Sequence, residues 1–265
     1  MKKKIFVIVL ALVLTASCIL SFAACNNGKS DADYIINKKT LVCGITLYEP
    51  MNYFDEEGDL IGFDTEFAQA VAEKLGIEAK FQIIKWSSKE LELNSKYIDC
   101  IWNGFTVTDE RKENIEFTKS YLNNTQCVVI KSANAAQYTG KEALAGKSAV
   151  AEAGSAGETE ANKLTTNVTP KNAQVDALTE VKSGSADFAV VDVVLANSMV
   201  GKGDYSDLSI ATAIQLEAEE YAIGFRKGSD MAAKVNDVID QLLEDGTLLA
   251  LAQKYGVAGQ LITKG

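Results

Sequence analysis

The sequence predicts an α/β fold of two lobes, each a mainly parallel sheet covered by helices. The chain has 265 residues, which suits one large domain or two medium ones with a proper hydrophobic core. Short apolar segments alternate with segments of helical periodicity, and this alternation predicts parallel strands joined by covering helices. The alternation begins near residue 40 and restarts after Lys131, so the same pattern occurs twice.

Apolar periodicity and capping residues justify the first series of elements. Phe67, Val71 and Leu75 fall on one face of a predicted helix. Asp64 can cap this helix and Gly76 can end it. The predicted strands cover residues 40–45, 79–84 and 98–102, and the predicted helices cover residues 64–75, 87–94 and a segment that begins at Thr108.

The second series has the same construction. Its predicted strands cover residues 148–151, 167–169 and 188–191, and its predicted helices cover residues 155–164, 172–183 and 193–200. Two apolar stretches, 126–130 and 221–225, could be plain core strands or the places where the chain crosses between lobes. If they cross, the last helices, at 231–243 and 247–255, return to the first lobe. Lobe 1 then comprises residues 39–127 and 221–265, and lobe 2 comprises residues 128–220.

The composition excludes several classes of chemistry. The chain has no histidine, so a Ser-His-Asp or Cys-His catalytic machine and an imidazole metal site are impossible. It has 26 Lys+Arg against 36 Asp+Glu, a formal charge of -10, and no basic tract. Nucleic acid is therefore not an expected partner, because phosphate binding needs clustered Lys and Arg. We expect neither a cofactor nor a metal.

Three cysteines beyond the N-terminal segment have apolar neighbours, which predicts buried free thiols in strands. They are Cys43, Cys100 and Cys127. Their number is odd and the chain has no CxxC, so neither a disulfide framework nor a zinc site is expected. Cys43 and Cys100 fall on strands that we expect to be adjacent, and whether they are close enough to pair is left open.

Residues 1–24 have the form of a secretory signal peptide. Lysines at positions 2–4 precede the apolar run Ile5 to Leu14, and small residues follow up to a cleavage point. A retained membrane anchor is the alternative, but a bilayer span needs about 20 predominantly apolar residues. This segment reaches that length only when its polar residues are counted. Cleavage removes three lysines and no acids, which changes the charge from 26 − 36 = -10 to 23 − 36 = -13.

The cleavage region, Phe22-Ala23-Ala24-Cys25, resembles a bacterial lipobox, in which the cysteine becomes the lipid-modified first residue of the mature chain. Phe22 departs from the usual leucine of that motif. Cys18 is a weaker candidate, and Cys25 could instead be a small apolar residue of an ordinary signal. The resemblance implies lipidation at Cys25, a flexible polar tether over residues 25–38, and a location outside the cytoplasm on the cell membrane.

An ordered set of motifs carries a family resemblance. The motifs are Leu60–Asp64, Ile98–Ile101, Asn103–Arg111, Phe117–Tyr121, Ala153–Gly157 and Ala186–Asp192. In this order and spacing they resemble the polar-amino-acid substrate-binding proteins of bacterial ABC importers, the family 3 extracellular solute-binding proteins. The resemblance covers about Lys38 to Gly256. It implies a type II periplasmic-binding-protein-like fold, whose lobes close on a free L-amino acid about a two-strand hinge and then face a membrane permease.

Arg111 is the residue whose position says most about a ligand. It is the third residue after Thr108, which begins a helix, and a guanidinium there can clamp a carboxylate with two parallel hydrogen bonds. The alternative is a solvated arginine on an acidic helix. The resemblance implies that Arg111 binds the α-carboxylate of the ligand.

The resemblance implies roles for five further polar or backbone positions. Thr106 would serve the carboxylate with its hydroxyl, and Gly104 would accept from the ammonium with its carbonyl. Ser155 and Ala156 would offer backbone N–H groups at the start of a helix. Asp192 would bind the ammonium, and it lies just past a strand, where α/β sheets place ligands. The alternatives are loop residues for Gly104 and Thr106, and a helix cap for Asp192.

The predicted walls of the pocket combine aromatic and charged residues. Tyr48 matches an aromatic position that packs on the ligand side chain, Trp102 and Phe105 are expected in the pocket wall, and each could instead be a core aromatic. Glu152 takes a place that the family often gives to glutamine, where a carboxylate would attract a basic or amide-bearing side chain. Lys89 would favour an acidic side chain or would pair with Glu152, and the role of Glu49 is open. We expect a polar ligand, with a slight preference for a cationic one.

The predicted function is a monomeric, non-enzymatic receptor that binds a free L-amino acid and delivers it to an ABC permease. An enzyme is one alternative, because some dehydratases of aromatic precursors share the fold and a carboxylate in the cleft could act as a general acid. A sensory ligand-binding module is the other. No kinase or other output domain follows in the sequence, which argues against the sensory role.

Overall fold

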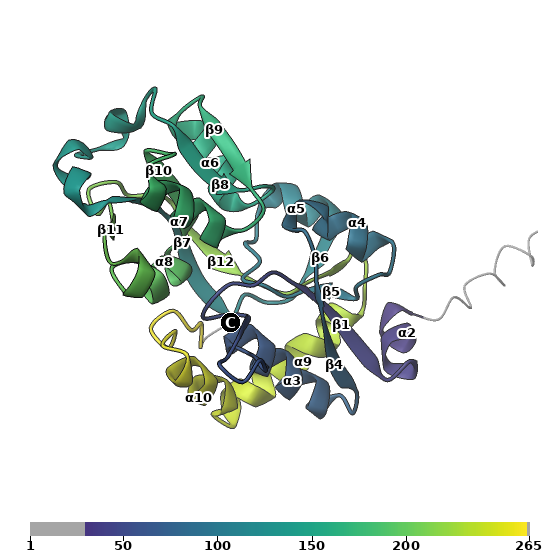
Figure 1. Ribbon diagram of the computed structural model, residues 1–265. Helices are drawn as coiled ribbons and strands as arrows, with labels where there is room; N and C mark the ends of the chain where they lie inside the picture. The colour runs from purple at the N-terminus through teal and green to yellow at the C-terminus, as the bar shows by residue number, and fades with distance from the viewer. Residues whose placement is uncertain (1–29, 264–265) are drawn as a thin grey trace, which may run out of the picture.

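The computed structural model describes residues 30–263, which build two sheets joined by a pair of crossing strands (Figure 1). The first sheet contains, in spatial order, β4 (Glu78–Ile83), β1 (Thr40–Ile45), β5 (Cys100–Ile101), β13 (Gly224–Arg226) and β6 (Ile115–Phe117). The second contains β11 (Leu208–Ile210), β7 (Leu122–Lys131), β10 (Phe188–Asp192), β8 (Ala149–Glu152) and β9 (Val168–Lys171). We call the part built on the first sheet lobe 1 and the part built on the second lobe 2. The predicted two-lobed α/β fold is confirmed.

Parallel pairing forms part of each sheet, and antiparallel strands complete it. In lobe 1, β1 runs parallel to β4 and β5, and in lobe 2, β8 runs parallel to β9 and β10. β13 runs antiparallel to both of its neighbours, and β7 runs antiparallel to β10 and β11. A strand that arrives directly from the other lobe needs no crossover helix before it, so it is free to pair antiparallel.

Two short paired strands connect the lobes. The first residues of β7 pair with β12 (Ala218–Tyr221), from Leu122 opposite Tyr221 to Thr125 opposite Ala218. The apolar stretch 126–130 is the lobe 2 half of β7, and 221–225 leads into β13 of lobe 1. The segment that crosses is therefore polar. Apolar periodicity locates the strands on either side of it but not the crossing itself.

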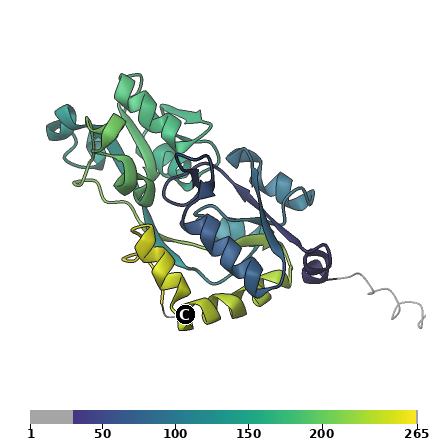
Figure 2. The same ribbon diagram turned by 60° about the horizontal axis from the view of Figure 1, so that its bottom comes forward.

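Helices cover the lobe 1 sheet. They are α3 (Phe63–Lys74), α4 (Lys89–Asn94), α5 (Asp109–Asn114), α9 (Met231–Glu244) and α10 (Thr247–Lys254), with a 3-10 turn at Trp86–Ser88 and a hairpin of β2 (Tyr53–Phe54) and β3 (Leu60–Ile61). Helices α3, α9 and α10 pack side by side (Figure 2). The predicted cap of α3 is wrong: the helix begins at Phe63 after Gly62, whose φ is 130°. The Asp64 carboxylate instead binds the loop at Gly104.

Helices of lobe 2 frame the other side of the cleft. They are α6 (Ala156–Leu164), α7 (Gln174–Ser183) and α8 (Val193–Met199), with 3-10 turns at Ser132–Gln137, Lys141–Leu144 and Gly203–Tyr205. Helix α7 ends at Gly184, as predicted, and Gly184 takes the left-handed φ of 84° that favours glycine at this position. Strands β8, β9 and β10 are each followed by one of these helices, so the carboxyl ends of the three parallel strands meet at the face that looks toward lobe 1.

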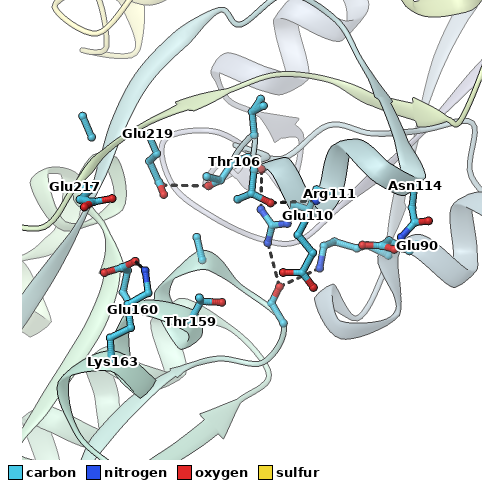
Figure 3. A pocket seen from close by; sticks show the side chains of 16 residues that line it. Glu90, Thr106, Glu110, Arg111, Asn114, Thr159, Glu160, Lys163, Glu217 and Glu219 are labelled. Atoms are coloured by element: carbon cyan, nitrogen blue, oxygen red, sulfur yellow. Dashed lines mark hydrogen bonds and ion pairs between the residues drawn. The ribbon is translucent and has the colours of Figure 1, made fainter.

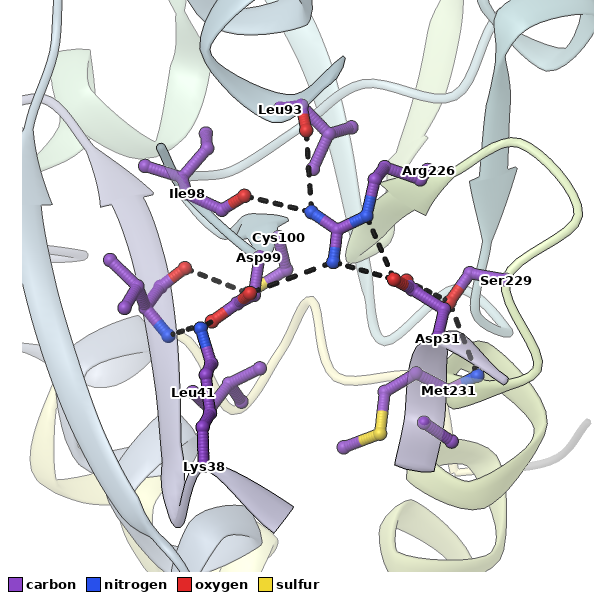
Figure 4. A network of polar contacts seen from close by, with 12 residues as sticks. Asp31, Lys38, Leu41, Leu93, Ile98, Asp99, Cys100, Arg226, Ser229 and Met231 are labelled. Carbon is purple, nitrogen blue, oxygen red and sulfur yellow. Dashed lines mark hydrogen bonds and ion pairs between the residues drawn. The ribbon is translucent and has the colours of Figure 1, made fainter. Parts of the chain in front are cut away.

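The first described element of the chain is a helix, α2 (Asp31–Asn37). It lies at the end of lobe 1 that is far from lobe 2 (Figure 1). Ala32 and Ile35 of α2 are fully buried. Asp31 accepts a hydrogen bond of 2.9 Å from Nε of Arg226 (Figure 4). The predicted flexible tether over residues 25–38 is therefore wrong from Asp31 onward, because amphipathic packing and this ion pair fix the segment to the lobe. The polar composition of this segment predicts neither the packing nor the ion pair.

The N-terminal predictions fall outside the described residues. The signal peptide at 1–24, the lipidation site Cys25 and the tether up to residue 29 all lie there. Within residues 30–263, no helix combines the length and the apolar character that a membrane crossing needs. The described cysteines are buried free thiols, and Cys43 lies directly opposite Cys100 on neighbouring strands without a bond between them.

Candidate functional site

Seven predicted site residues line one small space between the lobes. They are Gly104, Thr106 and Arg111 from lobe 1 and Glu152, Ser155, Ala156 and Asp192 from lobe 2. The space has a volume of about 10 Å³, which holds about one water molecule. The lobes must move apart before anything as large as an amino acid can enter. A wider cleft of about 550 Å³ adjoins this space and shares Thr106, Arg111 and Ala156 with it (Figure 3).

Arg111 is held at the cleft with no acidic partner. The sequence predicts a helix begun by Thr108, and the Thr108 hydroxyl caps α5 by accepting from the Arg111 N–H at 3.1 Å. The guanidinium donates to the Thr106 carbonyl at 2.7 Å and to the Gly154 carbonyl at 3.2 Å, and it lies 4.8 Å above the centre of the Phe105 ring. Among residues 30–263 no carboxylate lies within ion-pair distance of it. The guanidinium is thus oriented by carbonyls and a ring, which leaves its charge available to an anion.

Asp192 ends β10 and is surrounded by side-chain amides. Its Oδ1 accepts from Asn124 at 2.7 Å and from Gln126 at 2.6 Å, and its Oδ2 accepts from Gln174. It makes no side-chain cap to α8, so the alternative role as a helix cap is not seen. Burial raises the pKa of Asp192, and these hydrogen bonds oppose the rise. A buried carboxylate whose partners are all neutral is a favourable place for an ammonium group.

The Gly104 loop is fixed by a second buried carboxylate. Gly104 has a φ of 55°, and a Cβ there would lie 2.9 Å from the Tyr48 ring, so both conformation and space require glycine. Its N–H donates to Asp64 at 2.7 Å, and the Tyr121 hydroxyl donates to the other oxygen of Asp64 at 2.8 Å. Burial raises the pKa of Asp64 to about 7. The carbonyl of Gly104 is therefore presented by a rigid loop.

Ser155 and Ala156 begin α6 on the lobe 2 side. The Ser155 hydroxyl accepts from the Glu158 N–H at 3.0 Å and so caps the helix, and its own O–H remains a possible donor to a ligand. Ala156 follows as the first residue of the helix, at the edge of both the small space and the wider cleft. The start of α6 therefore offers backbone N–H groups at this edge, where the sequence places them.

Glu152 is a buried acid of the small space with an unused oxygen. It is 3% exposed, and its Oε1 has no hydrogen-bond partner among the described residues. Burial, together with the neighbouring Asp192, raises its pKa to about 8. The predicted alternative of a Lys89–Glu152 pair is not seen, because Lys89 donates to the carbonyls of Gly154 at 2.9 Å and Trp86 at 3.3 Å. Glu49 is exposed and lies outside this space.

The predicted aromatic residues lie behind the space and do not line it. Trp102 packs edge-on against Phe67 at 5.0 Å in the lobe 1 core, and Phe105 supports the Arg111 guanidinium from below. The Tyr48 hydroxyl bonds the Tyr221 hydroxyl at 2.9 Å. Trp86 provides the aromatic wall instead. The sequence identifies these residues as aromatic, but the packing of the folded chain determines which ring lines the space.

Three further residues of the site were not predicted. Asn103 and Gln174 line the small space, and Glu219 of β12 lines the wider cleft. Gln174 follows a parallel strand, and the carboxyl end of such a strand is a signal that could have found it. Glu219 accepts from Thr106 at 3.1 Å and from Gln126 at 2.8 Å (Figure 3 shows the first contact). Its place in a crossing strand carries no sequence signal. Burial and Asp192 raise its pKa to about 7.

The described part of the chain holds no group of three or more histidine, cysteine or acidic residues arranged to bind a metal ion. Its chemistry is instead that of a charged clamp. Arg111 faces Asp192 across a space bordered by a rigid carbonyl, helix N–H groups and two further acids. Such a set can hold a molecule that carries both a carboxylate and an ammonium.

The chain matches the model of the bacterial extracellular solute-binding proteins, family 3, over residues 41–258. It is 31% identical to the arginine-binding extracellular protein ArtP of Bacillus subtilis, over 92% of this chain and 96% of that protein. It is 30% identical to the L-cystine-binding protein TcyJ of Escherichia coli, over 82% of each.

Solved structures agree with these relatives. A substrate-binding protein of an ABC uptake transporter from Streptococcus pneumoniae with bound histidine gives a TM-score of 0.79 at 32% identity, covering 87% of this chain and 97% of that one. An ancestral amino-acid-binding protein, described as a precursor of cyclohexadienyl dehydratase, gives 0.78 at 26% identity, covering 85% and 99%. The family match, these likenesses and the two-lobed fold lead to one conclusion: the chain belongs to the bacterial extracellular solute-binding proteins of family 3.

Proposed function

We propose that this protein is an extracytoplasmic receptor that closes its lobes around one free L-amino acid with a cationic side chain and delivers it to an ABC-transporter permease. The observation that carries the choice of side chain is Glu152, whose buried Oε1 has no partner among the described residues. A buried carboxylate left without a partner is costly. A cationic group of the ligand would remove that cost.

The two ends of the amino acid would be held by opposite lobes. Arg111 of lobe 1 would bind the α-carboxylate, with the Thr106 hydroxyl and the N–H groups at the start of α6. Asp192 of lobe 2 would bind the α-ammonium, with the Gly104 carbonyl. Only a zwitterion satisfies both, and it does so only when the lobes meet. Contacts made only in the closed form shift the population toward closure.

The balance of charge supports a cationic side chain. A zwitterion would pair its carboxylate with Arg111 and its ammonium with Asp192, which leaves Glu152 and Glu219 without a cation. Lys89 forms no ion pair with them, because its ammonium contacts carbonyl oxygens. A guanidinium or ammonium on the ligand side chain would supply the missing charge. Relatives named as binding arginine and histidine are consistent with this choice, and the relative named as binding cystine shows that the fold also accommodates other amino acids.

An enzymatic role is the alternative, since one structural neighbour is described as a precursor of a dehydratase. A binding role is supported better. The space between the lobes brings a carboxylate-binding arginine and an ammonium-binding aspartate together, which suits a ligand that is retained whole. Incubation with arogenate-like substrates tests this choice: we expect no product, and steady product formation would contradict the binding role.

Lipid anchoring belongs to the same proposal. Lipidation at Cys25 would hold a monomeric receptor at the outer face of the cell membrane. The chain between Cys25 and α2 would keep lobe 1 close to that membrane, which raises the effective concentration near a permease. Mass spectrometry of protein expressed with its own N-terminal segment tests this: we expect a diacylglyceryl-modified Cys25 and release into the medium when Cys25→Ser is expressed.

The proposed function is tested by thermal denaturation of the purified mature protein with each of the twenty amino acids, ornithine and cystine. Ligand that binds only the folded state raises the melting temperature. We expect the largest rise with arginine or another cationic amino acid. No rise with any of them, in folded protein freed of ligand by refolding, would overturn the proposal. A rise confined to neutral amino acids would retain the receptor and exclude the cationic preference.

A further inference from the structure

One carbonyl of lobe 2 receives two cations from lobe 1. The Gly154 oxygen accepts from the Lys89 ammonium at 2.9 Å and from the Arg111 guanidinium at 3.2 Å. Gly154 lies in the turn between β8 and α6, whereas Lys89 begins α4 of lobe 1. The two hydrogen bonds therefore span the cleft, and they can form only when the lobes are together.

The surroundings of Lys89 give its ammonium few partners other than the Gly154 carbonyl. Lys89 is 6% exposed, its ammonium also donates to the Trp86 carbonyl at 3.3 Å, and it lies 4.9 Å from the centre of the Trp86 ring. Within residues 30–263 it has no carboxylate at ion-pair distance. Burial and the neighbouring Arg111 lower its pKa to about 8. A buried ammonium with only carbonyl and aromatic partners depends on each of them for its stability.

Gly154 is shaped for a close approach of the two lobes. Its φ is 74°, and a Cβ on it would lie 3.2 Å from the Cα of Ser87 in lobe 1. Its N–H donates to Glu158 at 2.6 Å, which fixes the direction of the turn. The backbones of the two lobes come close together here, at Gly154 and Ser87. The position of the Gly154 oxygen relative to lobe 1 therefore changes directly with the degree of closure.

We propose that Lys89 is a positioning residue for closure: its bond to the Gly154 carbonyl holds the lobes together and presents Arg111, which shares that acceptor, to the ligand carboxylate. Lys89 thus strengthens the binding of every ligand by the same factor and does not read the ligand side chain. This assignment rests on the proposed receptor function. It differs from a role in specificity, in which Lys89 would favour acidic ligands.

The test uses Lys89→Met, which keeps the length of the side chain but removes the charge and the donors. Lys85→Met, at an exposed lysine four residues earlier in lobe 1, is the matched control. Isothermal titration with arginine, ornithine, histidine and citrulline gives the affinities, and small-angle X-ray scattering with and without saturating arginine gives the degree of closure. A hydrogen bond to a charged group contributes about 1.5–3 kcal/mol. We therefore expect Lys89→Met to weaken each measurable ligand about tenfold or more by a common factor, to leave their ranking unchanged and to enlarge the radius of gyration with arginine.

Two further variants keep the test decisive. Lys89→Arg retains a cationic donor and should restore part of the affinity, whereas Gly154→Ala should weaken all ligands together because its turn and its contact with Ser87 leave no room for a methyl group. If the wild-type protein binds none of these amino acids, the receptor proposal has failed, and the scattering comparison of Lys89→Met with the wild type alone then decides whether Lys89 holds the lobes together. Unchanged affinities and scattering, or an altered ranking of ligands, would overturn the inference.

Discussion

Two clusters of buried charge in this protein are built in opposite ways. At the far end of lobe 1, Arg226 pairs with Asp31 at 2.8 Å and lies 3.5 Å from Asp99, and Lys38 binds Asp99 from the other side (Figure 4). In this cluster each charge faces an opposite one. Between the lobes, Glu152 has no cation within ion-pair distance among the described residues, and Arg111 and Asp192 are held only by neutral groups. There each charge lacks its counterpart.

The difference separates a structural role from a binding role. A buried charge that loses its partner destabilises the fold by several kcal/mol, so the Arg226 cluster fixes α2 to the sheet of lobe 1. The interlobe cluster holds charges that the fold tolerates without partners, at a cost in stability that a ligand of complementary charge removes. The same residue types thus serve architecture in one region and, in the function we propose, recognition in the other.

The largest effect is expected from Arg226→Ala. This change leaves Asp31 and the fully buried Asp99 without their guanidinium. Breaking one side of such a buried pair costs about 3–5 kcal/mol of unfolding free energy. Chemical denaturation should show that loss, while arginine affinity of the folded fraction stays as in the wild type. Lys227→Ala, at the exposed neighbour, is the control, and an equal loss of stability in both would remove the distinction between the clusters.

Arg111→Ala should have the opposite profile. In the function we propose, the guanidinium gives the ligand carboxylate two charge-assisted hydrogen bonds, each worth about 1.5–3 kcal/mol, so affinity should fall by at least about 100-fold. The melting temperature without ligand should stay nearly unchanged, because Arg111 pairs with no buried acid. Titration calorimetry and thermal denaturation measure the two quantities, with Lys112→Ala as the control. Retained arginine binding would show that another group holds the carboxylate.

A smaller effect follows from the raised pKa values of the cleft acids. Burial raises the pKa of Glu152 from 4.5 to about 8 and that of Glu219 from 4.5 to about 7. Between pH 4.5 and these raised pKa values, the folded state binds more protons than the unfolded state, so the free energy of unfolding falls as pH rises. Lowering the pH from 8 to 5 should therefore raise the melting temperature, by about 2–4 °C for each kcal/mol gained.

Glu152→Gln tests the source of this pH dependence, and Glu110→Gln is its control. Glu110 is an exposed acid at the edge of the wider cleft. Glu152→Gln should flatten the rise of melting temperature on acidification, whereas Glu110→Gln should follow the wild type. Identical pH profiles in all three proteins would mean that Glu152 is not the buried acid that the structure indicates.

The sequence predicts the architecture better than it predicts the walls of the site. The strand and helix periods identify both sheets, and Arg111 and Asp192 can be placed at the ends of their elements, because these signals are local. Trp86 and Glu219 reach the cleft through packing between segments far apart in the chain, which no local pattern records. Helix α2 was concealed for the same reason, since its partner Arg226 lies at the other end of the chain.

The central claim is that the unpartnered Glu152 carboxylate receives the cationic side chain of the ligand. The most direct measurement compares arginine with citrulline, its neutral analogue of nearly the same shape, by titration calorimetry at pH 8. We predict that the wild type binds arginine at least about tenfold more tightly than citrulline, since a hydrogen bond to a charged group contributes about 1.5–3 kcal/mol. We also predict that Glu152→Gln abolishes this preference. A wild type that binds both equally, or a Glu152→Gln variant that keeps the preference, would contradict the claim.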